Sequence, residues 1–305
     1  MNLKTKSSLA IVALLLVLFG IGAVIQNYLI QTSLKQTIAD QQFSLITRVA
    51  DEIDSRFRLQ GDALARVAAG ITPEVLADPL RLQAYLEDRH GLLSFFDDLV
   101  VVSPSLRVLA DHPVFPGRRG AEVAHFEHLR QVLETRQPAI SPPFLGKVTQ
   151  RPSLAQAVPV VDGAGRTVAI LSGQMNLLDP GFLGSLNERK SGRSGHFVLT
   201  TRERVTIVSR FKDRVMRLNV VPGANPVFDQ AIAGWEGTQE GTTSYGQRML
   251  MSFRSLRTAD WVLGSLLPVE EAYAPIHASR QTALWLMFGA SLLVGLIVWL
   301  MMRSL

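Results

Sequence analysis

Two long runs of apolar residues stand near the two ends of this 305-residue chain. The first, residues 9–25, contains no polar side chain, and the second, residues 283–302, is interrupted only by Ser291. A helix needs about 20 apolar residues to cross the hydrocarbon core of a bilayer. The pattern therefore predicts transmembrane helices over 9–28 and 282–302, with a cytoplasmic tail at 1–8 and a large polar region between the two spans.

A helical stripe follows the first apolar run. From residue 31 to about 70 there is no proline, and apolar residues recur mostly at spacings of four or seven. This predicts a stalk helix over 29–70 that continues the first span outward for roughly 60 Å. The stripe could pack on its own domain, or its part nearest the membrane could also face a second copy in a homodimer, and the two interpretations are compatible.

The pattern then changes to short strands and helices, which we assign to a distal module, residues 71–178. The expected order is a helix at 81–89, a hairpin at 97–103 and 106–111, a helix at 121–135, a proline-rich loop at 137–152 and a hairpin at 153–162 and 166–177. This order predicts an α+β unit, an antiparallel sheet with helices on one side, of the size of a Per-Arnt-Sim-like (PAS-like) module.

A similar order returns in residues 179–281, the proximal module. We expect a linker helix at 180–190, strands at 195–200 and 204–209, a helix at 226–234, and strands at 241–246, 247–256 and 260–268. A last helix begins at Pro268 and leads to the second apolar run, with a bend or restart near Pro275, because proline removes one helical hydrogen bond.

The distribution of charged residues predicts how the chain is oriented in the membrane. Lys4 and Lys6 flank the first apolar run and no acidic residue precedes Asp40, which orients the amino terminus to the cytoplasm. The central region is then periplasmic in a multi-pass inner-membrane protein. A cleaved signal peptide is the rival interpretation, but the first run exceeds the usual apolar length and no small-x-small site follows it.

Charge and composition argue against nucleic-acid binding and against cysteine chemistry. The net charge of +5 is spread over both signs, without a basic run interleaved with aromatic residues, so we expect no nucleic-acid partner. The chain has no cysteine, which excludes disulfides and thiolate chemistry.

Several local strings carry a family resemblance. "PVVDGAGRTVAILSGQMNL" at 159–177, "KSGRSGHFVLT" at 190–200 and "DWVLGSLLPVEEAYAPI" at 260–276 resemble segments of the double Cache (dCache) domain, the extracytoplasmic sensor of many bacterial receptors. With "NPVFDQAIAGWEGT" at 225–238, the ending looks most like sensors attached to diguanylate cyclases. The resemblance implies a small-molecule ligand in the distal module and a cytoplasmic output domain that follows the second span.

By position, the resemblance places the ligand pocket between the sheet and the segments 121–136 and 141–156. The polar candidates there are Asp111, His125, Arg130, Lys147, Arg151 and Gln156. Arginine pairs bidentately with carboxylates and lysine supplies a point charge, so a small carboxylate is the expected ligand. Each of these residues could instead be an ordinary solvated side chain. The helix string "HFEHLRQVLE" lacks the Tyr and Trp of the family's amino-acid-binding members, which argues against an amino acid.

We expect neither a metal, a cofactor nor catalysis in this chain. His125 and His128 are three residues apart, but no third metal ligand has motif spacing. No nucleophile elbow or phosphate-binding glycine loop is present, and Ser194 lies in a turn between glycines. A bitopic envelope interaction or assembly protein without a small-molecule ligand is the alternative to a sensor. An extracytoplasmic hydrolase has no supporting motif.

Overall fold

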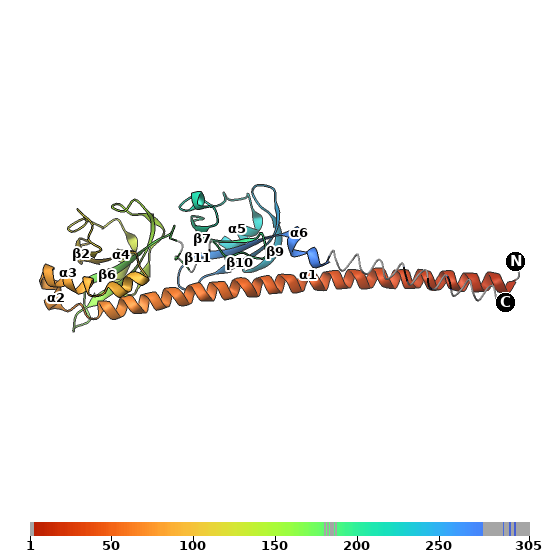
Figure 1. Ribbon diagram of the computed structural model, residues 1–305, viewed down its shortest axis with the longest axis horizontal. Coiled ribbons are helices and arrows are strands. Elements are labelled where there is room, and N and C mark those ends of the chain that lie inside the picture. Colours follow the sequence, from red (N-terminus) through yellow and green to blue (C-terminus); the bar gives the residue numbers. More distant parts are fainter. Residues whose placement is uncertain are drawn as a thin grey trace.

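The computed structural model describes residues 3–276, except 180, 182, 184, 185 and 187, together with 289, 293 and 296. Its axis is one helix, α1 (Leu3–Ala68), of 66 residues. Two sheet modules lie one after the other along the same side of α1, which extends well beyond them towards its amino terminus (Figure 1). The predicted stalk is therefore the second half of a longer continuous helix.

The predicted spans are not visible as such. Among the residues that the structure describes, none of the helices combines the length and the apolar character that a bilayer crossing requires. The expected second span, 282–302, lies outside the described residues except at 289, 293 and 296.

The distal module contains an antiparallel sheet in the order β2-β1-β6-β5-β3, with β4 also paired to β5. The strands are β1 (Asp98–Val102), β2 (Val108–His112), β3 (Ala139–Ile140), β4 (Phe144–Leu145), β5 (Pro152–Val161) and β6 (Thr167–Asn176). Short helices α2 (Pro73–Ala77), α3 (Pro79–Glu87) and η1 (His90–Ser94) connect α1 to β1. Both predicted hairpins are present.

The proximal module contains a second antiparallel sheet, in the order β8-β7-β11-β10-β9. Its strands are β7 (His196–Thr201), β8 (Thr206–Ser209), β9 (Gly237–Thr242), β10 (Arg248–Ser255) and β11 (Trp261–Pro268). The helical elements are η3 (Lys212–Arg214), α5 (Pro226–Ile232) and α6 (Val269–Ala272). After α6, Tyr273 forms a turn and helical conformation resumes at 274–276, so the last helix is interrupted close to Pro275 as expected.

Each sheet is covered on both faces, and the prediction of helices on one side was wrong. In β1, Leu99 and Val101 join the core against α1, whereas Val100 and Val102 join a second core under α4 (Glu127–Thr135). In the proximal sheet, α5 covers the face opposite α1 in the same way. A strand that is buried throughout, like β1, has two apolar faces and needs two covering layers.

Three predicted elements differ from those observed. The helix expected at 121–135 begins only at Glu127, because residues 121–123 run beside the start of β2. Val108 N of β2 donates to Ala121 O, and Val123 N donates to Leu106 O just before β2. The strand expected at 241–246 lies at 237–242, since residues 243–246 form the turn into β10. Among the described residues of 180–190, none is in an α-helix.

Polar anchors join α1 to the proximal module beside this apolar packing. The carboxylate of Asp54, only 3% exposed, accepts hydrogen bonds from Arg257 N, Thr258 N and Thr258 Oγ1 at 2.6–3.1 Å. These donors belong to the turn between β10 and β11. A second anchor is the bidentate pair of Glu52 with Arg189, with both N–O distances 2.7 Å.

Replacing Asp54 should therefore loosen the proximal module from the helix. We expect Asp54→Ala to lower the free energy of unfolding by about 2–3 kcal/mol, because the partly buried donors of Arg257 and Thr258 lose a charged acceptor. Asp51→Ala is the matched control, since Asp51 forms only an exposed contact with Arg257 at 3.9 Å and should cost less than about 1 kcal/mol. Urea titration of the full chain measures both values, and equal losses would contradict the anchoring role.

Candidate functional site

The distal module contains a cavity of about 240 Å³ between its sheet and α4. The sheet contributes an apolar floor from β1, β2 and β5, with the polar side chains of Ser172 and Gln174 on β6. The segment 117–129 and the loop 144–149 form the other walls. The cavity lies on the face opposite α1, where the sequence analysis expected a pocket.

Arg118 is a buried, ion-paired cation in the lining of the cavity. Its side chain is 8% exposed, and Nη2 donates to Asp98 Oδ1 at 2.8 Å. The other terminal nitrogen, Nη1, is buried without a hydrogen-bond partner. The guanidinium also lies 5.2 Å from the centroid of the Phe115 ring. Arg118 is thus held in place on one side and keeps an unused donor on the other.

Asp98 completes a buried ion pair with Arg118. Burial raises the pKa of Asp98, while the charge and hydrogen bond of Arg118 oppose that rise. Removing one partner of such a pair leaves an uncompensated buried charge, so the two residues depend on each other. The pair fixes a cation at the edge of an otherwise largely apolar space.

Aromatic rings and two histidines line the α4 side of the cavity. Phe126 and Phe144 meet edge to face with centroids 4.8 Å apart, and His128 is stacked with Phe144 at 6.5 Å. Burial lowers the pKa of His128 to about 4, so this imidazole is neutral at pH 7. His125 packs on Phe126 with ring centroids 4.1 Å apart.

The structure brings together only part of the predicted set. His125 and Lys147 line the cavity, whereas Arg130 and Arg151 are exposed and are not among its lining residues. Asp111 is buried near Asp98 but does not line the cavity, and its Oδ2 accepts from Phe115 N at 2.8 Å.

Gln156 lies on the opposite face of the sheet. Its Nε2 donates to Phe57 O of α1 at 3.0 Å, close over Gly61, where a Cβ atom would come within 2.5 Å of that nitrogen. The side chain therefore ties β5 to α1 and points away from the cavity.

Sequence reasoning missed Arg118. The signal that could have found it is the string "PGRRG" at 116–120, in which Gly117 and Gly120 both have φ of +77°. Glycines with positive φ indicate a tight, fixed loop. Arg118 lies in such a loop directly after β2, so its position made it a candidate for the ligand pocket.

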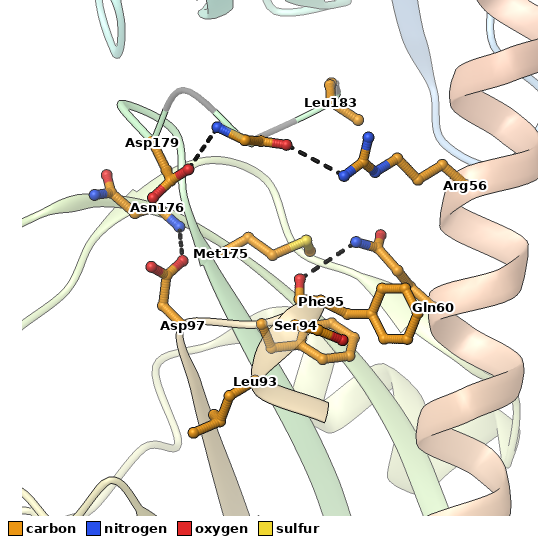
Figure 2. Close-up of a pocket in the computed structure, with 12 residues that line it drawn as sticks. Arg56, Gln60, Leu93, Ser94, Phe95, Asp97, Met175, Asn176, Asp179 and Leu183 are labelled. Atoms are coloured by element: carbon orange, nitrogen blue, oxygen red, sulfur yellow. Dashed lines mark hydrogen bonds between the residues drawn. The ribbon is translucent and has the colours of Figure 1, made fainter. Parts of the chain in front are cut away.

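A second cavity, of about 180 Å³, lies between α1, η1 and the segment after β6 (Figure 2). Arg56 Nη2 donates to Gly181 O at 3.2 Å, and Gln60 Nε2 donates to Phe95 O at 3.3 Å. Dashed lines from Arg56 and Gln60 mark these bonds in Figure 2. Asn176 N donates to Asp97 Oδ2 at 2.6 Å in the same place. These bonds join α1 to the distal sheet and to the connection between the modules, which indicates a structural joint.

Comparison with protein families matches residues 30–276 to the Cache domain, in its dCache_1 form. The chain belongs to the Cache domain family. The match begins where the first apolar run has ended and finishes with the described helical residues after α6. The resemblance recognised in the sequence strings is therefore confirmed at the level of the family. Comparison with curated proteins found no match.

Solved structures share this Cache fold. The ligand-binding domain of the Pseudomonas aeruginosa amino acid chemoreceptor PctB with L-Arg is 17% identical with a TM-score of 0.64, and the match covers 78% of this chain and 98% of that one. The ligand-binding domain of the Pseudomonas fluorescens chemoreceptor CtaA with L-isoleucine is 15% identical with a TM-score of 0.61, covering 80% and 98%.

A longer relative is an extracellular ligand binding receptor from Desulfohalobium retbaense, 18% identical with a TM-score of 0.59. That match covers 73% of this chain but only 39% of the receptor. At these identities the likeness establishes the fold of the Cache domain, and the ligand has to be argued from the residues of this chain.

His128 predicts a pH dependence of stability. In the unfolded chain His128 becomes protonated as the pH falls below 6.5, whereas in the folded protein its pKa is about 4. Protons therefore bind preferentially to the unfolded state, and the free energy of unfolding falls as the pH drops from 6.5 to 4. We expect His128→Phe, which keeps the ring packing, to reduce the loss of unfolding free energy between pH 7.5 and 5.0 by about 2 kcal/mol. Urea titrations at both pH values measure the difference. The exposed His90 gives the control His90→Gln, and an equal effect there would contradict the assignment.

Proposed function

We propose that this Cache domain is the periplasmic ligand-sensing region of a membrane receptor and that its distal cavity binds a small carboxylate. The observation that carries the proposal is Arg118, a buried guanidinium with one terminal nitrogen unpaired beside an apolar cavity. A ligand carboxylate would use that nitrogen in a charge-assisted hydrogen bond.

The surrounding residues support the same ligand chemistry. Lys147 adds a second positive charge at the cavity, and Glu122 is the single acidic residue among the described lining residues. His128 is neutral and packed on aromatic rings, which suits the apolar body of a ligand. The volume is below the roughly 300–1,000 Å³ of sites for drug-sized molecules, so the ligand is small.

Amino acids are the second candidate ligands. The solved ligand-binding domains of PctB and CtaA share this fold and are described as complexes with L-Arg and L-isoleucine, respectively. An α-amino acid also needs a partner for its ammonium group. Among the described lining residues, the one carboxylate, Glu122, is exposed, and Asp98 behind the lining is already paired with Arg118, which favours a simple carboxylate over an amino acid.

Calorimetric titration of the full chain with acetate, propionate, succinate and the L-amino acids tests the proposal. We expect Arg118→Lys, which keeps the charge beside Asp98 but loses the guanidinium fork, to weaken carboxylate binding by about tenfold or more. Lys147→Gln should weaken it a few-fold, because Lys147 is exposed.

Arg130→Gln is the matched control, since it removes a positive charge from the exposed side of α4. Affinity that falls equally in this variant would point to non-specific charge. If only L-amino acids bind, the proposed simple carboxylate is wrong and an amino acid is the ligand of the distal cavity. No binding across the panel would favour the envelope assembly protein.

We further propose that both apolar runs cross the inner membrane and that the region between them is periplasmic. Large apolar side chains are exposed on α1 before the Cache match begins: Val17, Leu18, Ile21, Val24, Ile25 and Leu29 are each 52–67% exposed. Such a continuous apolar surface is unfavourable in water and is typical of contact with lipid or protein.

A topology reporter tests this arrangement. Alkaline phosphatase, which is active only outside the cytoplasm, should be active when fused after Gly163 and silent when fused after Leu305. Activity at both fusion points would show that the second apolar run does not return the chain to the cytoplasm.

The output of the receptor is also a proposal. On the resemblance of residues 225–238 and 260–276, we propose a cytoplasmic diguanylate cyclase as the output domain, with two copies of the chain paired along the part of α1 nearest the membrane. Leu29 and Ile30 are exposed in that part of α1 and could contribute to such a contact.

A further inference from the structure

We propose that the proximal module holds a second ligand site, for a small carboxylate with an apolar body, in the cleft between β7, the segment 210–214 and the turn before β10. This site is separate from the distal cavity. The cleft has a volume of about 390 Å³, and its floor continues into a smaller cavity of about 40 Å³. Its polar side is formed by His196, Arg210 and Arg214, and its apolar side by Phe211, Met249 and Pro268.

The charges of this cleft are unbalanced. The guanidiniums of Arg210 and Arg214 each lie 5.1 Å from the centroid of the Phe211 ring. Neither forms an ion pair within the described residues, and no described residue lining either cavity is acidic. Two like charges held around one ring repel each other, and a bound anion would relieve that repulsion.

His196 supplies an unused polar atom at the same place. Its Nδ1 is buried without a hydrogen-bond partner, and its ring meets Phe211 edge to face with centroids 6.2 Å apart. Burial and the charges of Arg210 and Arg214 lower the pKa of His196 to about 4. The residue is therefore neutral at pH 7 in the absence of an anion.

The cleft adjoins the helix that leaves the module. Ser194, which lines the cleft, donates through its N and its Oγ to Glu271 of α6 at 3.1 and 2.5 Å. The carbonyl of Ser194 accepts from Arg210 Nη1 at 3.4 Å. An anion that binds Arg210 competes with this long hydrogen bond, so occupancy of the cleft acts on Ser194, the residue that also contacts Glu271.

Fluorine NMR of 4-fluorobenzoate added to the full chain tests the proposal. We expect saturable binding that Arg214→Gln and Arg210→Gln each weaken by about tenfold or more. Arg217→Gln is the matched control, because Arg217 is exposed, lies three residues after Arg214 and lines neither cavity, and it should change affinity by less than about twofold. Arg118→Lys and Lys147→Gln report on the distal cavity. They should leave unchanged the binding step that Arg210→Gln and Arg214→Gln weaken, and a separate step that only these two variants lose would belong to the distal cavity.

The titration of His196 provides a second readout. A carboxylate bound between the two arginines should raise the pKa of His196 from about 4, measured from its imidazole chemical shifts with and without the probe. Absence of saturable binding, an equal loss in Arg217→Gln, a loss of the same binding step in the distal variants, or binding that leaves the His196 titration unchanged would each overturn the proposal.

Discussion

The packing of one face of α1 against both sheets is the constraint on which the rest of the structure depends. Ile46, Val49 and Ile53 belong to the same apolar cluster as Leu99 of the distal sheet and Leu199 of the proximal sheet. Neither module closes its core without this helix. Buried polar contacts fix the position of α1 along the sheets, since Asp54 caps a turn of one module and Phe57 O accepts a hydrogen bond from Gln156 of the other. Apolar burial supplies most of the free energy, and the polar contacts select one register.

Covering one face of each sheet with α1 leaves the other face for a short helix and a cavity. In the distal module, α4 begins late because residues 121–123 pair with the backbone beside β2, and the cavity opens next to this extended segment. In the proximal module, α5 is only 7 residues long, and the segment 210–214 with the turn at 243–246 borders the opening. Both cavities thus arise from the same architecture, and each places arginine side chains beside aromatic rings. Arg118 keeps one terminal nitrogen unpaired, and Arg210 and Arg214 form no ion pair within the described residues.

The two proposed sites differ in how firmly their cations are held. Arg118 is buried and paired with Asp98, so its donor has a fixed direction and little conformational entropy is lost when a ligand binds. Arg210 and Arg214 are exposed and are positioned mainly by Phe211. A ligand can shift such a protein only through different affinities for two conformations. The contact of Glu271 with Ser194 and the interruption of the last helix at Tyr273 are the places where such conformations would differ near the end of the Cache match.

The sequence by itself determined the order of elements and the family, because these follow from local patterns. The stalk stripe, the hairpins of β1–β2 and β5–β6, and the strings at 159–177, 190–200 and 260–276 are readable from residue spacing and turn chemistry. Only the tertiary structure decided which candidates share a cavity. Gln156 lies in a strand whose alternate residues face opposite layers, and it points to α1 because Gly61 makes room for it. Arg118 lies 20 residues after Asp98 in the sequence. Because β1 pairs with β2, the loop after β2 that carries Arg118 lies beside Asp98 at the start of β1. Such contacts depend on long-range packing and strand register, and no local pattern contains them.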